Sequence, residues 1–181
     1  MTGHRKLRSA ASGKHAEWAF MKRFEVPSFD EPDVNYMTRL RVIQTPWFGI
    51  YLHRFDRPDS RPTLHDHPWP FASFVIRGAG YVERVGLNKT RRRVCWANFK
   101  RATDLHYIEE LLSPVVWTLV VVGRRRRAWG YVDYPADRIT DPLEARYQWT
   151  RFDVHPHAHE FDAAMAARKA ADADRHDQPP R

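Results

Sequence analysis

Residues 64–80 decide the fold of this chain, and they read LHDHPWPFASFVIRGAG. His65 and His67 are separated by one residue, so on an extended chain both side chains point to the same side. An apolar run follows at 71–76, and Gly78-Ala79-Gly80 then makes a turn typical of a β-hairpin. The segment therefore predicts two imidazoles on one side of the chain, within reach of one metal ion, directly before a hairpin.

Short strand-like runs continue on both sides of this segment. They are rich in Val, Ile, Thr and aromatic residues, and turn residues separate them. The runs predict strands near 36–44, 47–55, 71–77, 81–86, 92–99, 104–110, 115–122 and 127–134. Many short strands at nearly even spacing predict an all-β sandwich or barrel. Strands do not alternate with helices, so a parallel sheet is not expected.

The histidine pair and the turn after it resemble a known family. His65-Asp66-His67, followed by Val75-Ile76-Arg77-Gly78, resembles the first motif of the cupin superfamily, and His106 stands where the second motif supplies a histidine. The resemblance covers residues 36–134, and the string His-Asp-His-Pro-Trp resembles a small, poorly characterised cupin group. It implies a double-stranded β-helix, or jelly-roll barrel, which holds one divalent metal ion with His65, His67 and His106.

One position departs from the cupin pattern. Cupins commonly carry a glutamate shortly after the second histidine, but Phe71 and Ala72 occupy those positions here. Either three histidines bind the metal alone, or a carboxylate comes from elsewhere, and Glu83 across the glycine turn is the best substitute. The alternative is a Glu83 that is exposed or paired with Arg84 or Arg77. Imidazole ligands suit Fe, Mn, Ni, Zn or Cu.

A metal with open coordination positions suits an enzyme. The preferred interpretation is dioxygenase-like chemistry on a small anionic metabolite. Arg54, Arg77 and Arg101 are candidates to bind its carboxylate or phosphate, and Tyr81 and Tyr107 are candidate proton donors. The alternative is a non-catalytic ligand-binding or sensor cupin that acts with a partner protein. Cupins often pair through their sheets, so a homodimer is the expected assembly.

The chain divides into three predicted parts. Residues 1–14 form a flexible basic arm, 15–161 form the cupin domain, and 162–181 form a flexible or helical tail with few large apolar residues. Apolar residues at helical spacing predict a short amphipathic helix over 15–24 at the start of the domain.

A group of three histidines near the C-terminus and one single histidine, His53, also need an interpretation. His155, His157 and His159 alternate like a ligand set, but a metal site needs rigid support, which this Pro-interrupted segment does not offer. His53 lies in a predicted strand and is either a pocket residue or a half-buried structural histidine.

Charge and composition limit the possible partners. The formal net charge is +8, which attracts anionic partners without specifying them. No nucleic-acid-binding motif is visible, so nucleic acid is not the expected partner. The single cysteine suits a reducing compartment. Without a signal peptide or a membrane span, a cytoplasmic protein is expected.

Overall fold

The structure is a computed structural model, and it describes residues 19–28, 31, 34–133 and 147–167, except 157, 161 and 164. Nearly all of these residues lie in or between β-strands. In chain order the strands are β1 (Ala19–Pro27), β2 (Asn35–Gln44), β3 (Gly49–Phe55), β4 (Leu64–His65), β5 (Phe71–Arg77), β6 (Tyr81–Val85), β7 (Thr90–Val94), β8 (Ala97–Lys100), β9 (His106–Leu111), β10 (Val116–Val122), β11 (Gly130–Asp133) and β12 (Gln148–Arg151). A 3-10 turn, η2 (Phe152–Val154), follows, and the described residues of 156–167 are helical.

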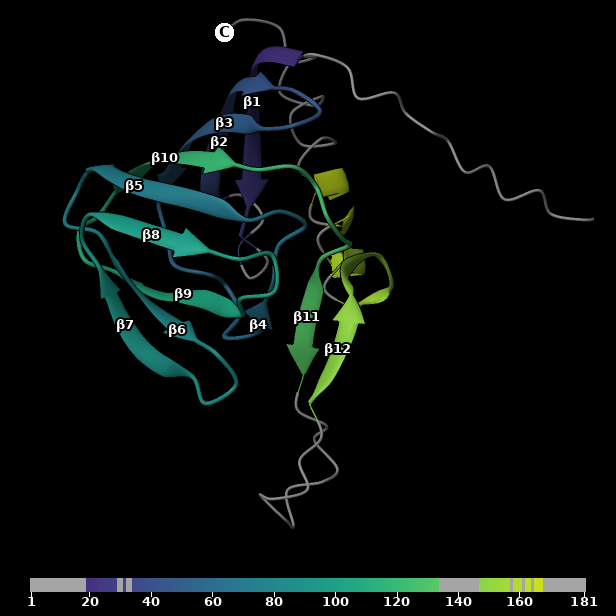
Figure 1. The fold of residues 1–181 in the computed structure, drawn as a ribbon. Coiled ribbons are helices and arrows are strands. Elements are labelled where there is room, and N and C mark those ends of the chain that lie inside the picture. The colour runs from purple at the N-terminus through teal and green to yellow at the C-terminus, as the bar shows by residue number, and fades with distance from the viewer. Residues whose placement is uncertain are drawn as a thin grey trace, which may run out of the picture.

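Two six-stranded antiparallel sheets face each other. Their strand orders are β1-β2-β3-β10-β5-β8 and β12-β11-β4-β9-β6-β7. In Figure 1, β10, β5 and β8 lie above β9, β6 and β7, and the β11–β12 hairpin extends the lower sheet. Strands far apart in sequence pair within each sheet, as in a jelly roll. The predicted cupin jelly-roll barrel is therefore confirmed.

The alternation of side chains along the strands builds the core. Burial alternates strictly in β3 and nearly so in β10, because successive side chains point to opposite faces. Met37, Phe55 and Val116 from one sheet meet Tyr81 and Ile108 from the other in one cluster. Each fully buried apolar side chain of this size contributes about 1.5–3 kcal/mol, so this cluster holds the two sheets together.

The hairpin predicted at the glycine turn after β5 is wrong, because this turn leads from one sheet to the other. β5 pairs with β10 and β8, whereas β6 pairs with β9 and β7. Gly80 has a φ of +91°, which L side chains rarely adopt. A Cβ at this position would also lie 2.0 Å from the carbonyl oxygen of Val94. The turn therefore requires glycine, both for its backbone conformation and for space.

The predicted helix over 15–24 is wrong in its described part, because residues 19–27 form strand β1. The backbone of β1 pairs antiparallel with β2 from Ala19↔Gln44 to Val26↔Met37 and extends the sheet by one strand. Val26 packs against the apolar cluster. Tertiary pairing along β2 overrides the local helical spacing.

The predicted strand 92–99 is two strands, β7 and β8. β7 pairs with β6 in one sheet, and β8 pairs with β5 in the other. The chain crosses between the sheets at Cys95 and Trp96, which is 75% exposed. A corner of the barrel therefore interrupts a run that looks continuous in the sequence. The sequence also did not predict β4 and β12, which are short.

The predicted ends of the chain remain predictions. The arm at 1–14 and the part of the tail after residue 167 lie outside the described residues. No helix in the described part of the chain has the length and apolar character needed to cross a bilayer.

Candidate metal centre

The histidine pair is delivered by the short strand β4 and the residues after it. Leu64 and Asp66 are buried at 1% exposure on the side of the β11–β12 hairpin, while His65 and His67 line the cavity between the two sheets. The alternation expected for an extended chain therefore sends both imidazoles inward. His65 Nδ1 lies 3.4 Å from the carbonyl oxygen of Thr63.

The third histidine comes from β9. His106 is paired with His65 in the sheet register, so the two rings lie side by side, with centroids 5.0 Å apart. The Nε2 atoms of His67 and His106 are 2.8 Å apart, and one ligand atom from each of the three histidines lies within 4.8 Å of the others. Two imidazole nitrogens bound to one ion lie about 3 Å apart. The three histidines are the one such cluster among the described residues.

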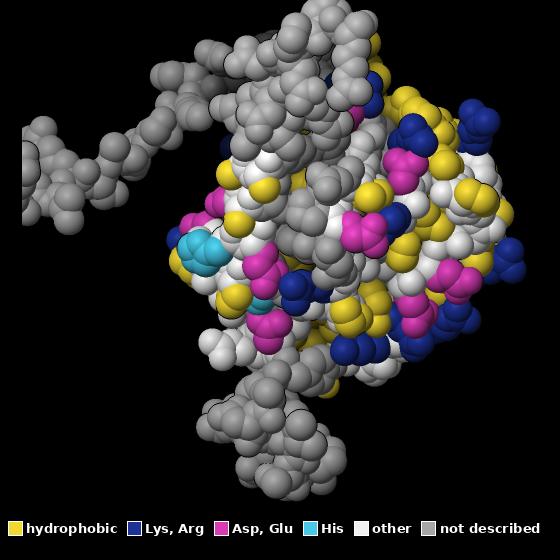
Figure 2. Space-filling model, turned by 180° about the vertical axis from the view of Figure 1, so that it is seen from behind, with side chains coloured by type: hydrophobic (Ala, Val, Ile, Leu, Met, Phe, Trp, Pro, Cys, Tyr) yellow, Lys and Arg dark blue, Asp and Glu magenta, His cyan; other side chains and the backbone are white. Residues whose placement is uncertain are grey.

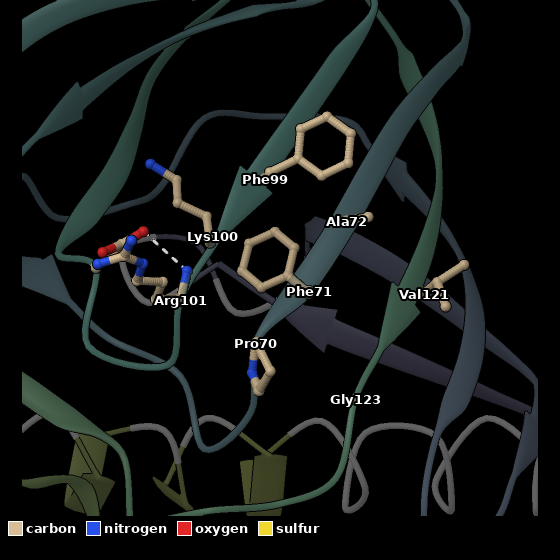
Figure 3. A pocket seen from close by; sticks show the side chains of 9 residues that line it. Pro70, Phe71, Ala72, Phe99, Lys100, Arg101, Val121 and Gly123 are labelled. Carbon is tan, nitrogen blue, oxygen red and sulfur yellow. Dashed lines mark hydrogen bonds between the residues drawn. The ribbon is translucent and has the colours of Figure 1, made fainter.

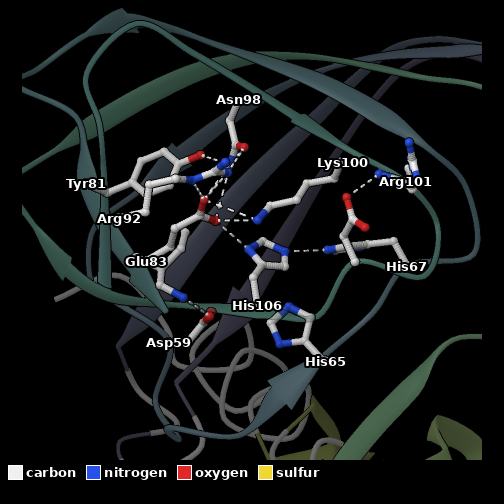
Figure 4. A network of polar contacts seen from close by, with 12 residues as sticks. Asp59, His65, His67, Tyr81, Glu83, Arg92, Asn98, Lys100, Arg101 and His106 are labelled. Carbon is white, nitrogen blue, oxygen red and sulfur yellow. Dashed lines mark hydrogen bonds and ion pairs between the residues drawn. The ribbon is translucent and has the colours of Figure 1, made fainter. Parts of the chain in front are cut away.

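Glu83 lies behind His106 rather than beside the other histidines (Figure 4). Its Oε2 is 2.9 Å from His106 Nδ1, so Nε2 of that ring is left to face His67. Arg92, Asn98 and Lys100 also bind the Glu83 carboxylate, with Lys100 Nζ at 3.1 Å. With its oxygens occupied in this way, Glu83 is placed to orient a ligand rather than to be one.

The charge on Glu83 is strongly favoured. Burial alone would raise its pKa, but the hydrogen bond and charge of His106, the charge of Lys100 and the hydrogen bond of Arg92 lower the pKa to about 2. Glu83 is therefore an anion at neutral pH, and it favours His106 with a proton on Nδ1 and a free Nε2.

The other two imidazoles are held neutral. Burial lowers the pKa of His65 to about 4 and lowers that of His67 well below its usual value, with the neighbouring histidines adding to the effect. A neutral imidazole is the form that binds a transition metal. The donor set is thus chemically suited to a divalent ion.

Asp66, between the two histidines, fastens the C-terminal strands to the site. Its carboxylate accepts hydrogen bonds from Gly130 N at 2.8 Å and Trp149 Nε1 at 3.0 Å, and it lies 2.9 Å from Arg127. The Arg127 guanidinium stacks over Trp149 at 4.9 Å. The histidine pair therefore gains its rigidity from residues far along the chain.

The histidines open into a cavity of about 380 Å³ between the sheets. Its walls are mostly apolar and aromatic, including Trp69, Phe71 and Tyr131. Such a volume and lining are typical of a small-molecule site. Arg39, His53 and Thr118 also line the cavity. Of these three, the sequence indicates only His53 as a candidate pocket residue.

The two predicted tyrosines lie on opposite sides of the sheet. Tyr81 lines the cavity, where its hydroxyl accepts a hydrogen bond from Asn98 at 3.1 Å, and burial raises its pKa to about 12. Tyr107 follows His106 on β9 and therefore points the other way, into a cluster with Leu64 and Val132. Of these two tyrosines, only Tyr81 lines the cavity that contains the histidines.

The three predicted arginines are not brought to the cavity. Arg54 lies on the outer face of β3 and pairs with Asp56 at 2.7 Å, because its neighbours His53 and Phe55 take the inward positions. Arg77 is exposed at the end of β5. Arg101 lines an open groove on the outside of the barrel, and its backbone N–H donates to Asp104 (Figure 3).

The C-terminal histidines do not form a cluster among the described residues. His155 is buried, and its Nε2 pairs with Asp133 of β11. His157 lies outside the described residues. The arrangement of His155 is that of a structural contact between the C-terminal segment and β11.

No protein-family model matches the chain, and no curated protein sequence is significantly similar to it. Among solved structures the fold is similar to Fe(II) HppE, at 14% identity over 56% of each chain with a TM-score of 0.48. A cupin-2 domain protein from Rhodospirillum rubrum matches at 13% identity over 60% of this chain and 73% of that one, with a TM-score of 0.45. A cupin 2 conserved barrel domain protein from Rhodopseudomonas palustris matches at 19% over 56% and 68%, with a TM-score of 0.41.

These similarities are of fold, and the match spans little more than half of the HppE chain. The strand order shows the fold without these comparisons. The chain is a cupin-type jelly-roll barrel with three histidines gathered inside it.

Proposed function

We propose that His65, His67 and His106 bind one divalent transition metal ion, and that the chain is a metal-dependent enzyme acting on a small molecule in the cavity. The observation that carries this proposal is the convergence of three imidazoles in the wall of one cavity between the sheets. Fe, Mn, Ni, Zn and Cu all suit such ligands. Three protein ligands leave coordination positions for a substrate.

The finer proposal is oxygenase-like chemistry on a small organic anion. A bound metal would supply Lewis acidity or a site where substrate and dioxygen meet. The residues of the chain contribute the rest. Glu83 fixes the ring of His106, and the aromatic walls exclude water from the reacting groups. Tyr81, with its hydroxyl in the cavity wall, is the candidate to hold a proton near the substrate.

Metal analysis of the purified protein tests the site. The wild-type chain is expected to carry about one ion per chain, and His106→Ala should lose most of it, since two imidazoles bind a labile ion weakly. Replacement of His155, His157 and His159 together is the control and should leave the metal in place. Loss of metal in the control, with retention in His106→Ala, contradicts the proposal.

Oxygen consumption with panels of small acids and thiols, after anaerobic loading with Fe(II), tests the chemistry. Turnover that disappears in His106→Ala supports an enzyme. Binding of metal and small molecules without turnover, under every metal of the series, identifies a ligand-binding cupin instead.

Surface charge bears on the remaining partners. On the face drawn in Figure 2, basic side chains lie beside acidic ones. Among the ion pairs of the structure, Arg84 pairs with Glu109, and Arg91 pairs with Glu109 and Glu110. Such pairing neutralises part of the basic surface and favours a small anion over nucleic acid as the ligand. The homodimer and the cytoplasmic location remain predictions, and light scattering of the purified protein tests the first.

A further inference from the structure

A polar row crosses the inner face of the sheet opposite the histidines. In the sheet register Arg39 of β2 pairs with His53 of β3, which in turn pairs with Thr118 of β10. Residues directly opposite on neighbouring strands share a face, and all three line the cavity. The adjacent row, Met37, Phe55 and Val116, is apolar. The polar row therefore lies directly beside an apolar row in the cavity wall.

Among the described residues, no acidic side chain neutralises the charge of Arg39. Its Nε donates to His53 Nε2 at 3.0 Å, and its guanidinium stacks over the Tyr51 ring at 5.6 Å. Within the described part of the chain no carboxylate lies within ion-pair distance of it. Arg61, also in the cavity wall, differs in this respect because it lies 3.2 Å from Glu160.

Asp59 is the acidic side chain that lines the same cavity, and its oxygens are already engaged. One accepts from the Tyr36 hydroxyl and the other from the backbone N–H of Ile108 at 2.6 Å. An arginine enclosed without an acidic partner is costly unless an anion joins it. The cavity therefore leaves one cationic group available to a ligand.

His53 holds Arg39 without cancelling its charge. Burial, with the charge of Arg39 as a second cause, lowers the pKa of His53 well below its usual value. The ring is neutral at physiological pH, so its Nε2 accepts the Arg39 Nε–H. The two terminal nitrogens of the guanidinium then remain for a planar, bidentate partner such as a carboxylate or phosphate.

Thr118 provides a second and independent observation. Its side chain is 1% exposed, and its Oγ1 has no hydrogen-bond partner among the described residues. A buried hydroxyl without a partner costs about 1–3 kcal/mol, and most such groups in folded proteins are satisfied. Thr118 lies in the same row as Arg39, and it lines the same cavity.

We infer that Arg39 and Thr118 form an anion subsite that receives the carboxylate or phosphate of a small organic acid. The apolar or aromatic body of that acid then lies against the cavity wall, with its other end toward His65, His67 and His106. This inference deepens the proposed function, since it names the substrate class of the same cavity. It also replaces Arg54, Arg77 and Arg101 as the residues expected to bind the anion.

Calorimetry with matched probes tests the subsite. Benzoate and phenyl phosphate carry the anion, and benzamide is a neutral molecule of nearly the same shape as benzoate. The full chain is titrated as purified and again after metal removal with EDTA. We expect benzoate or phenyl phosphate to bind at least about tenfold more tightly than benzamide in both states, as charge-assisted hydrogen bonds imply.

Four variants locate the effect. Arg39→Gln should reduce the preference for benzoate over benzamide to within about twofold, and Thr118→Val should weaken benzoate about three- to tenfold. Arg54→Gln, on the outer face of β3, is the matched control and should change nothing. Circular dichroism confirms folding, and Arg39→Lys, which keeps the charge, should retain part of the preference if Arg39→Gln fails to fold.

The outcomes separate this inference from the metal proposal. A preference that survives Arg39→Gln, disappears in Arg54→Gln or is absent from the wild-type chain overturns the anion subsite, whatever the metal content. A preference that depends on Arg39 in a chain that binds no metal supports the subsite and overturns the metal proposal alone. If phenyl phosphate binds and benzoate does not, the ligand is a phosphate ester rather than a carboxylic acid.

Discussion

Glu83 and Arg39 lie on opposite sheets of the same barrel, and the protein compensates their charges differently. Glu83 is fully buried, and four side chains, His106, Arg92, Lys100 and Asn98, bind its carboxylate. Arg39, in contrast, donates a hydrogen bond to the neutral imidazole of His53 and stacks over the aromatic ring of Tyr51. A buried charge with a full set of partners belongs to the fold, whereas a charge without an opposite partner is available to a ligand.

The largest effect is expected at Glu83. Glu83→Gln keeps the shape of the side chain but leaves Lys100, which is 3% exposed, without its anion. Breaking a buried ion pair on one side costs about 3 kcal/mol or more. Urea denaturation should show a loss of this size in the free energy of unfolding.

Glu109→Gln is the matched control for Glu83. Glu109 also contacts two arginines, Arg84 and Arg91, but it lies on the outer face of β9, in contact with water. Surface ion pairs contribute little, so this variant should lose only a small fraction of the stability lost at Glu83. Equal losses in the two variants contradict the distinction between a buried and a surface network.

An intermediate effect is expected from His53 as the pH falls. The folded state keeps His53 neutral, because burial lowers its pKa well below 6.5, while the unfolded chain takes up a proton near that pH. The stability that His53 contributes is therefore complete above about pH 6.5 and falls as the pH decreases. Between about pH 7 and pH 5.5 this amounts to about 1 kcal/mol for one excluded proton.

Urea denaturation in EDTA at both pH values measures this effect. The wild-type chain should lose about 1 kcal/mol more than His53→Gln on acidification. His65 and His67 change in the same direction in both proteins, because their pKa values are also lowered, so they cancel in the difference. Equal losses in the two proteins mean that His53 is protonated in the folded state and that Arg39 is held differently.

The smallest effect on stability is expected at Arg39. Arg39→Met removes a charge that no acidic side chain compensates within the described residues. The loss of the hydrogen bond to His53 offsets the free energy gained by placing an apolar side chain in the cavity wall. The free energy of unfolding should change by less than about 1 kcal/mol in either direction. A loss as large as that of Glu83→Gln, measured in the same urea series, means that Arg39 supports the fold and is not a ligand group.

Much of the barrel could be predicted from local patterns. The apolar run of β5 and the glycine turn after it mark a strand and its end, because only glycine fits at Gly80. The strict alternation of β3 marks its inner face. The spacing of His65 and His67 places both rings on one side. These are properties of a few consecutive residues, so one sequence is enough to read them.

Other features depend on neighbours that are distant in sequence. The local spacing of apolar residues in β1 predicts a helix. The segment is a strand because it pairs with β2, and this tertiary contact is not visible in the sequence. In β2 the alternation is weak, and Leu40 and Val42 make the face opposite Arg39 look like the inner one. Only the register with β3, where Arg39 meets His53, places this arginine inside the barrel.

The sequence by itself determined the class of fold and three histidines suited to one metal ion, because strand periodicity and ligand spacing are local. The tertiary structure alone decided which charges are compensated. It placed Glu83 behind His106 rather than in the ligand set, and Arg39 opposite the histidines without a carboxylate partner among the described residues. The physical reason is that compensation of a buried charge depends on distances between strands, which register and sheet packing fix and which no single segment contains.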